Sequence, residues 1–149
     1  MSLLTDADQI RNLLGEYCWR IDQGDFAGVG ALFASGVLAS EDGFVFARGA
    51  DEVEAWYAGG TQLHEGSPRT KHIVADTIID EPGPDGSVLV RSSYVVLQGV
   101  DGNPPRPIIS GRYLDTFRRH DSHTWHFAER RFIVDLIGDL SHHWSGPTG

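Results

Sequence analysis

The sequence predicts an α+β fold in which N-terminal helices pack on one face of a curved, mostly antiparallel sheet. Residues 5–33 and 51–62 read as helices on either side of a short hairpin, whereas residues 70–136 read as long β-branched segments separated by turns. Helices followed by consecutive strands are typical of the α+β class. No linker, repeat or low-complexity tract interrupts the 149 residues, so we expect a single domain over residues 1–149.

Residues 5–25 form the strongest helical pattern. The apolar stripe consists of Ile10, Leu13, Leu14, Tyr17, Cys18 and Ile21. Thr5 and Asp8 have the spacing of a helix-capping pair. Tyr17 brings a hydroxyl into the apolar stripe, and Asp22 lies about 40° beyond its edge at roughly 100° per residue. This helix therefore offers a phenol and a carboxylate to the core boundary.

The remaining elements follow from local signals. We expect helices at 26–33 and 51–62, and strands at 37–40, 44–48, 70–79, 87–100, 108–119 and 125–136. Asp25 is placed to cap the second helix, and Asp42-Gly43 is a strong hairpin signal between the first two strands. Gly99 and Gly111 interrupt long strands, where they favour bulges or bends that curve the sheet. A sheet that curls around helices leaves a conical hollow.

Composition and charge exclude several classes of function. The formal net charge of −9 argues against a nucleic-acid or anionic-membrane surface. The single cysteine cannot form an internal disulfide and fits a reducing compartment. Neither a signal peptide nor an apolar run near the roughly 20 residues of a membrane span is visible. We expect a cytoplasmic protein that binds a small-molecule substrate and forms a homodimer or homotrimer, which would cover the open sheet face.

His72 is the candidate third group of a constellation with Tyr17 and Asp22. It lies early in a β-branched strand. A histidine paired with a carboxylate is a common general base, because the acid fixes the ring tautomer and stabilises the imidazolium. The 50-residue separation does not itself bring the two together. A core tyrosine, a turn-initiating acid and a hydrogen-bonded structural histidine are the alternative interpretations.

Other side chains are candidates for lining a substrate pocket. The aromatic candidates are Trp56, Tyr57, Tyr94 and Tyr113, with ordinary core packing as the alternative. Strand alternation places Arg130 on the face of Ala128, Phe132 and Val134, which favours an inward direction, but Phe127 and Ile133 share the opposite face, so alternation alone does not settle it. A buried guanidinium needs an acid or a substrate anion. Arg130 is therefore either a leaving-group stabiliser or a structural ion pair.

The sequence predicts no metal and no cofactor. His120, His123 and His126 lie three residues apart across a turn and a strand start, without helical metal-ligand spacing or paired cysteines. Glycine-rich phosphate loops and a GxSxG nucleophile elbow are absent from the sequence. Cys18 lies in the helical stripe, where we expect an inert core thiol.

Six short motifs are spread over nearly the whole chain: 17–26, 31–33, 49–53, 70–74, 111–121 and 125–127. In this order they resemble the SnoaL-like branch of the nuclear transport factor two-like superfamily. The resemblance implies a cone-shaped α+β barrel. Scytalone dehydratase, a bile-acid dehydratase and hexachlorocyclohexane dehydrochlorinase in this family carry an aspartate and a histidine at the positions of Asp22 and His72. They remove a proton and a leaving group from a small cyclic substrate, with the histidine as base.

The resemblance also implies roles for individual residues. The bile-acid dehydratase has a tyrosine at Tyr17, and the dehydrochlorinase has an arginine at Arg130. Scytalone dehydratase carries a second histidine near Gln98, where this chain departs from it. In ketosteroid isomerase, the oxyanion tyrosine falls at Tyr17. The general base of that isomerase falls near Glu41, although the hairpin turn explains Glu41 equally well.

These observations lead to one principal hypothesis and two alternatives. The principal hypothesis is a cofactor-independent, dehydratase-type lyase that acts on a small, cyclic, largely apolar substrate. In it, His72 is the base, Asp22 orients His72, Tyr17 binds a substrate oxygen, and Tyr113 and Arg130 assist in positioning. The first alternative is an isomerase or polyketide cyclase with Tyr17 and a different base, in which Tyr113 near the isomerase's oxyanion-hole acid would donate to an enolate. The second is a non-catalytic binding or assembly module.

Overall fold

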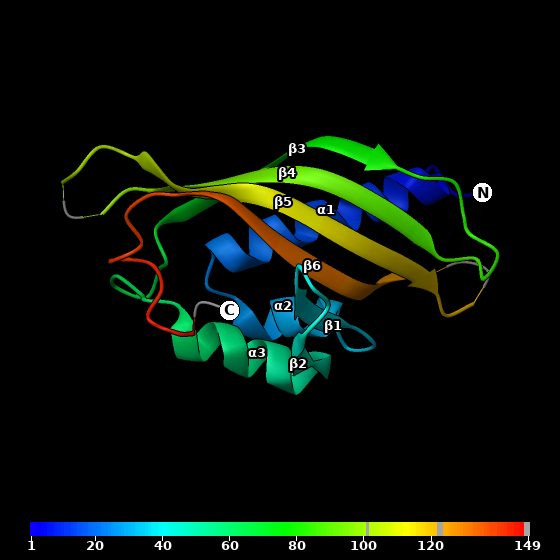
Figure 1. Cartoon of the computed structure of the whole chain (residues 1–149), viewed down its shortest axis with the longest axis horizontal. Helices are drawn as coiled ribbons and strands as arrows, with labels where there is room; N and C mark the ends of the chain where they lie inside the picture. The colour runs from blue at the N-terminus through cyan, green and yellow to red at the C-terminus, as the bar shows by residue number, and fades with distance from the viewer. Residues whose placement is uncertain (101, 122–123, 148–149) are drawn as a thin grey trace.

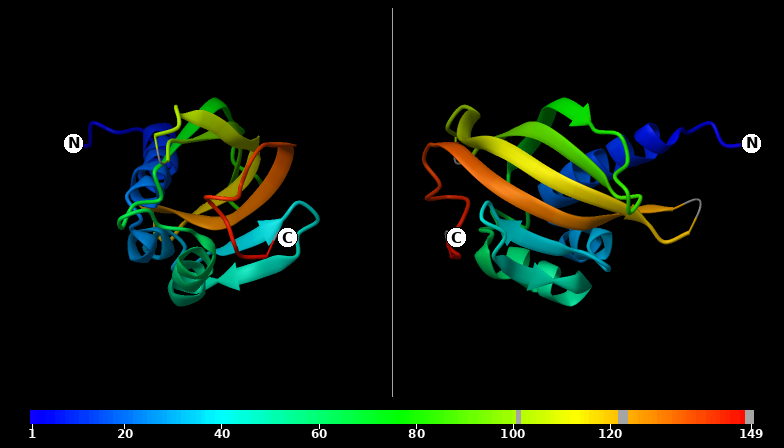
Figure 2. Two further views of the ribbon diagram at one scale, coloured as in Figure 1. Left: turned by 90° about the vertical axis from the view of Figure 1, so that its left-hand side faces the viewer. Right: turned by 45° about the vertical axis from the view of Figure 1, so that its right-hand side comes forward.

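One six-stranded mixed sheet, curved around the helices, organises the chain. The computed structural model describes residues 1–100, 102–121 and 124–147. The elements are α1 (Asp6–Asp22), α2 (Phe26–Leu32), β1 (Val37–Ser40), β2 (Val45–Arg48), α3 (Gly49–Gly60), β3 (Thr70–Ile79), β4 (Val88–Gln98), β5 (Arg106–Arg119) and β6 (Trp125–Ile137). The strand order is β2-β1-β6-β5-β4-β3. Figures 1 and 2 show the long strands curving over α1, with α2 and α3 below them. The predicted α+β class is confirmed.

Helix α1 is built as its sequence pattern predicts. The Thr5 hydroxyl accepts from the Asp8 amide at 3.1 Å, and the Asp8 carboxylate accepts from the Thr5 amide at 2.9 Å. This reciprocal cap satisfies two free donors of the first turn. The buried face carries Ile10, Leu14, Tyr17 and Ile21. Because α1 packs against β3, its last residue, Asp22, reaches the first residues of that strand.

The sheet differs from a simple meander in one pairing. Strand β1 runs parallel to β6, whereas the other neighbouring strands in the described part of the chain are antiparallel. The β1–β2 hairpin therefore extends the sheet beyond β6. Helix α3 begins at Gly49, which has φ +78°, and not at the expected Asp51. Gly111 lies at a register shift between β5 and β6, as expected, but Gly99 lies beyond the end of β4.

Simple alternation fails along β6. It places Phe127 and Arg130 on opposite faces, yet both are fully buried. The reason is a register shift beside Thr116, where Thr116 pairs with Glu129 and Phe117 pairs with Phe127. The extra residue, Ala128, restores Phe127 to the inner face. None of the helices in the described residues is long and apolar enough to cross a membrane.

Candidate active site

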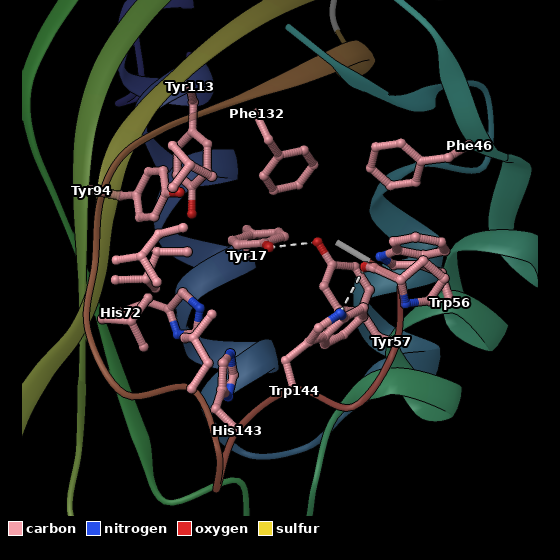
Figure 3. A pocket seen from close by; sticks show the side chains of 16 residues that line it. Tyr17, Phe46, Trp56, Tyr57, His72, Tyr94, Tyr113, Phe132, His143 and Trp144 are labelled. Atoms are coloured by element: carbon pink, nitrogen blue, oxygen red, sulfur yellow. Dashed lines mark hydrogen bonds between the residues drawn. The ribbon is translucent and has the colours of Figure 1, made fainter. Parts of the chain in front are cut away.

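A cavity of about 360 Å³ opens between the inner face of the sheet, helices α1 and α3, and the segment after β6 (Figure 3). It is lined by Tyr17, Phe46, Trp56, Tyr57, His72, Tyr94, Val96, Ile109, Tyr113, Phe132, Val134, Ile137, Leu140, His143, Trp144 and Pro147. This volume and its largely apolar wall are typical of small-molecule sites. Its polar side-chain groups are phenols, imidazoles and indole N–H groups, so the cavity offers hydrogen bonds without a fixed charge.

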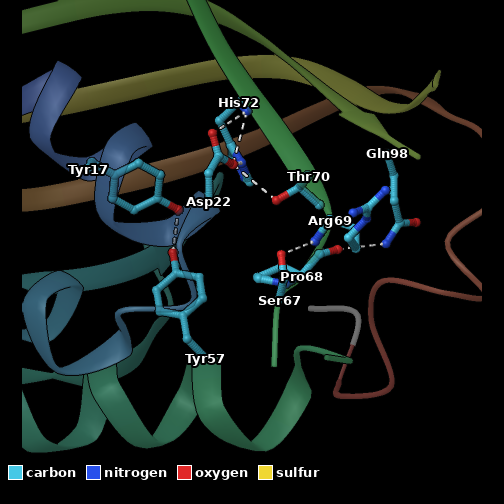
Figure 4. A network of polar contacts seen from close by, with 9 residues as sticks. All are labelled: Tyr17, Asp22, Tyr57, Ser67, Pro68, Arg69, Thr70, His72 and Gln98. Carbon is cyan, nitrogen blue, oxygen red and sulfur yellow. Dashed lines mark hydrogen bonds and ion pairs between the residues drawn. The ribbon is translucent and has the colours of Figure 1, made fainter. Parts of the chain in front are cut away.

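Asp22 and His72 meet at the wall of this cavity. The His72 Nδ1 lies 2.6 Å from the Asp22 Oδ1, and the side chains are only 8% and 16% exposed (Figure 4). A carboxylate can only accept, so the neutral ring carries its proton on Nδ1. The Nε2 lone pair is then free to act as a base toward a molecule in the cavity. The principal hypothesis requires a contact between these two residues, and the structure contains it.

The Asp22 carboxylate is fixed by more than the imidazole. The His72 backbone amide donates to Asp22 Oδ2 at 2.9 Å and to Oδ1 at 3.1 Å, and the Thr70 hydroxyl donates to Oδ1 at 3.0 Å. The carboxylate at the end of α1 thus links this helix to the first residues of β3 (Figure 4). Several donors from one rigid strand hold it in a single orientation, which in turn fixes the plane of the His72 ring.

Tyr17 and Tyr57 form a phenol pair across the cavity. Their hydroxyl oxygens lie 2.6 Å apart and both side chains are buried. Burial raises the pKa of Tyr17 and raises that of Tyr57 well above its ordinary value. Both phenols therefore stay protonated at neutral pH. One hydroxyl donates to the other, which leaves one O–H of the pair free to donate to a substrate oxygen.

Aromatic rings and a buried ion pair pack around Tyr17. Tyr94 and Tyr113 stack with ring centroids 4.4 Å apart. The Arg130 guanidinium lies 3.6 Å from the Tyr113 ring centroid and 4.4 Å from that of Tyr17. Its Nε and Nη2 donate to Asp115 at 2.8 and 2.9 Å, and both residues are 0% exposed. Burial lowers the pKa of Arg130, but the Asp115 carboxylate outweighs it, so the guanidinium stays charged.

Comparison with known proteins shows the family of the chain. The model of the SnoaL-like domain matches residues 2–131. The chain belongs to the SnoaL-like domain family. No curated protein sequence matches this SnoaL-like domain.

Several solved structures share the fold of this SnoaL-like domain. ActVI-ORFA from Streptomyces coelicolor is 21% identical, with a TM-score of 0.71 over 85% of this chain and 95% of its own. A scytalone dehydratase candidate from Novosphingobium aromaticivorans is 20% identical, with a TM-score of 0.69 over 97% and 93%. A nuclear transport factor two-like protein with a cystatin-like fold from the same organism is 24% identical, with a TM-score of 0.71 over 87% and 81%. At these identities the similarity establishes the cone-shaped α+β fold.

The other predicted site residues of the SnoaL-like domain divide into two groups. Trp56, Tyr94 and Tyr113 line the cavity together with Tyr17 and His72. Arg130 is not among the described residues of the lining, since its charge is turned toward Asp115 behind the rings. Glu41 is exposed in the turn between β1 and β2 and is likewise outside the lining. The hairpin interpretation of Glu41 therefore fits its position.

Sequence reasoning missed the contribution of the C-terminal segment. His143, Trp144 and Pro147 line one side of the cavity, a role that the sequence pattern did not assign to them. The Gln62 amide donates to the His143 carbonyl at 2.9 Å, and the Ser145 amide donates to the Gly60 carbonyl at 2.9 Å. The sequence carried one weak signal for this role, a mild excess of histidines.

Metal-ligand types do not gather in the described part of the chain. Among residues 1–100, 102–121 and 124–147, no group of three or more His, Cys, Asp or Glu side chains could hold a metal ion. The His120 and His126 rings stack with centroids 3.9 Å apart, and His123 lies outside the described residues. Cys18 is partly buried, and burial raises the pKa of its thiol, which makes it a poor nucleophile.

Proposed function

We propose that this SnoaL-like domain is a cofactor-independent lyase that eliminates water from a small, cyclic, largely apolar β-hydroxy carbonyl compound. The observation that carries the proposal is the 2.6 Å contact between Asp22 and His72 at the wall of an aromatic cavity. Removal of a carbon-bound proton and departure of a hydroxyl are acid–base steps, for which the described side chains suffice. The apolar wall, rich in aromatic side chains on which a flat ring can stack, favours a cyclic substrate.

The mechanism begins with the His72 Nε2, which takes the proton α to the carbonyl. Asp22 accepts the Nδ1–H and stabilises the resulting imidazolium. The carbonyl oxygen gains negative charge and accepts a hydrogen bond from the free O–H of the Tyr17–Tyr57 pair. The carbon–oxygen bond at the β position then breaks, and the imidazolium returns its proton to the departing hydroxyl as water. The apolar wall strengthens these interactions by excluding solvent.

The test uses a panel of cyclic β-hydroxy ketones, because the conjugated enone product absorbs in the ultraviolet. For a ketone that the parent protein turns over, His72→Ala lowers kcat/KM by at least about 100-fold, the smaller end of general acid–base effects. Asp22→Asn gives a comparable loss because the ring is no longer oriented. His126→Ala removes a histidine outside the cavity lining and keeps the parent rate. Parent rates in both dyad variants would refute the proposal.

An isomerase is the second candidate, because the Tyr17–Tyr57 pair would stabilise an enolate in that reaction as well. Measuring the release of water and the exchange of the α proton distinguishes the two reactions. An isomerase relocates a double bond and exchanges the α proton without loss of oxygen from the substrate. If the domain binds ring compounds and turns over none of them, it is a binding module and not an enzyme.

A further inference from the structure

A second imidazole, His143, lies in the cavity beside the dyad and is unexplained by it. Figure 3 shows its ring below that of His72. His143 lies within electrostatic reach of both His72 and Asp22. It comes from the segment after β6 and not from the helix or strand that carry the dyad.

The backbone around His143 is held in place from several directions. The His143 amide donates to the Leu140 carbonyl at 2.9 Å, and its carbonyl accepts from the Gln62 amide at 2.9 Å. The preceding carbonyl, that of His142, accepts from the Gln98 side chain at 3.0 Å and lies 2.8 Å from the His64 Nε2. These hydrogen bonds fix the backbone from which the His143 side chain enters the cavity.

The ring itself is not satisfied by the protein. Its Nδ1 is buried and has no hydrogen-bond partner among the described residues. If the neutral ring carried its proton on Nδ1, that N–H would be buried without an acceptor. The proton is therefore favoured on Nε2. The protein therefore leaves the Nε2–H of His143 available to a molecule in the cavity.

His72 and His143 therefore present opposite polarity to the cavity. Asp22 holds the proton of His72 on Nδ1, so the Nε2 of His72 is an acceptor. His143 presents an Nε2–H donor. Burial, and after it repulsion from His72 when that ring is protonated, lowers the pKa of His143 to about 4. His143 therefore stays neutral at neutral pH and adds no charge beside the imidazolium that forms on His72. A neutral imidazole of this kind donates a hydrogen bond and transfers no proton.

We propose that His143 is a substrate-binding residue whose Nε2–H donates a hydrogen bond to the departing hydroxyl oxygen of the substrate. That the oxygen departs rests on the proposed elimination, whereas the hydrogen bond to a ring alcohol does not. In the reaction, the proton taken by His72 returns to this same oxygen as the carbon–oxygen bond breaks, so one water leaves and His143 is unchanged. The substrate then carries two oxygens, one at the Tyr17–Tyr57 pair and one at the imidazoles.

The test compares two non-reacting probes that differ by one hydroxyl, tetralin and 1-tetralol. Their binding is followed by the fluorescence of Trp56 and Trp144, which line the cavity. In His143→Phe, we expect about tenfold weaker binding of 1-tetralol, the loss of one hydrogen bond, and unchanged binding of tetralin. His142→Phe is the matched control, because that neighbouring ring contacts His64 and is not in the described lining. Equal changes for both probes, or no change, would overturn the proposal.

A measurement on the unaltered protein covers the case in which His143→Phe does not fold. Nitrogen-15 NMR of the histidine side chains at pH 7 shows which ring nitrogen of His143 carries the proton. We expect a protonated Nε2 whose resonance shifts on addition of 1-tetralol and not of tetralin. A proton on Nδ1, or the same shift with both probes, would contradict the proposal. Because neither probe reacts, these outcomes are independent of whether the domain proves to be a lyase.

Discussion

The buried pair of Arg130 and Asp115 offers the sharpest stability prediction. The substitution is Asp115→Asn, which keeps the shape of the side chain and removes its charge. In the parent protein two hydrogen bonds of 2.8 and 2.9 Å join the pair, and both residues are 0% exposed. After the change, a charged guanidinium remains among the rings of Tyr17, Tyr113 and Phe127 without a counter-charge.

The expected loss follows from the environment of the pair. Removal of one partner of a buried ion pair costs about 3–5 kcal/mol. The contacts of Arg130 with the aromatic rings remain in the variant, so they do not add to the loss. A domain of this size has a total unfolding free energy of about 5–15 kcal/mol. At about 2–4 °C per kcal/mol, Asp115→Asn lowers Tm by roughly 6–20 °C.

Urea denaturation followed by circular dichroism measures the change in unfolding free energy. Asp115→Leu combined with Arg130→Met removes both charges, and we expect it to recover a substantial part of the single-variant loss, because no uncompensated charge remains. A loss below about 1 kcal/mol in Asp115→Asn would refute the reasoning. It would mean that the guanidinium binds another group or solvent, and that Arg130 is available to bind a molecule in the cavity.

Three further predictions concern the cavity wall. Tyr57→Phe leaves the buried Tyr17 hydroxyl without its partner and lowers the unfolding free energy by about 1–3 kcal/mol, measured in urea; no change would show that water replaces Tyr57. The pKa of His143 is about 4 in the folded chain and about 6.5 in the unfolded chain, so the unfolded chain binds the proton first as the pH falls. The unfolding free energy therefore keeps its full value above pH 6.5 and falls by up to about 3 kcal/mol toward pH 4. His143→Asn lacks this component, and an identical pH profile of the free energy would contradict the assignment. Gly60→Ala places a methyl group against the Trp144 ring and costs about 1–3 kcal/mol, with a weaker Trp response to tetralin; a parent-like Tm would contradict the packing.

The parts of the fold that were predicted correctly depend on local chemistry. The period of apolar residues in α1 and its Thr5–Asp8 cap are contained within a few turns, so the sequence determines the helix and its buried face. The Asp25 cap of α2 and the turn after Ser40 are equally local. Long strands were also recognisable, because β-branched residues favour extended backbone.

The parts that were missed depend on contacts between distant segments. The parallel pairing of β1 with β6 has no signal in either strand. The face of Phe127 depends on a register shift that simple alternation ignores. The meeting of Asp22 with His72 was not missed, but the family resemblance implied it and their separation in the sequence did not. His143 reaches the cavity only because backbone groups of α3 and its following loop hold the segment after β6 in place.

The central claim is that His72, oriented by Asp22, removes a carbon-bound proton from a molecule in the cavity. Proton NMR in deuterated buffer tests it with 2-tetralone, a bicyclic ketone whose α protons exchange measurably. We predict that the parent protein accelerates this exchange above the buffer rate, and that His72→Ala and Asp22→Asn reduce the protein-catalysed rate by about 100-fold or more. Exchange at the buffer rate with the parent protein saturated by 2-tetralone, or an equal acceleration by parent and both variants, would contradict the claim.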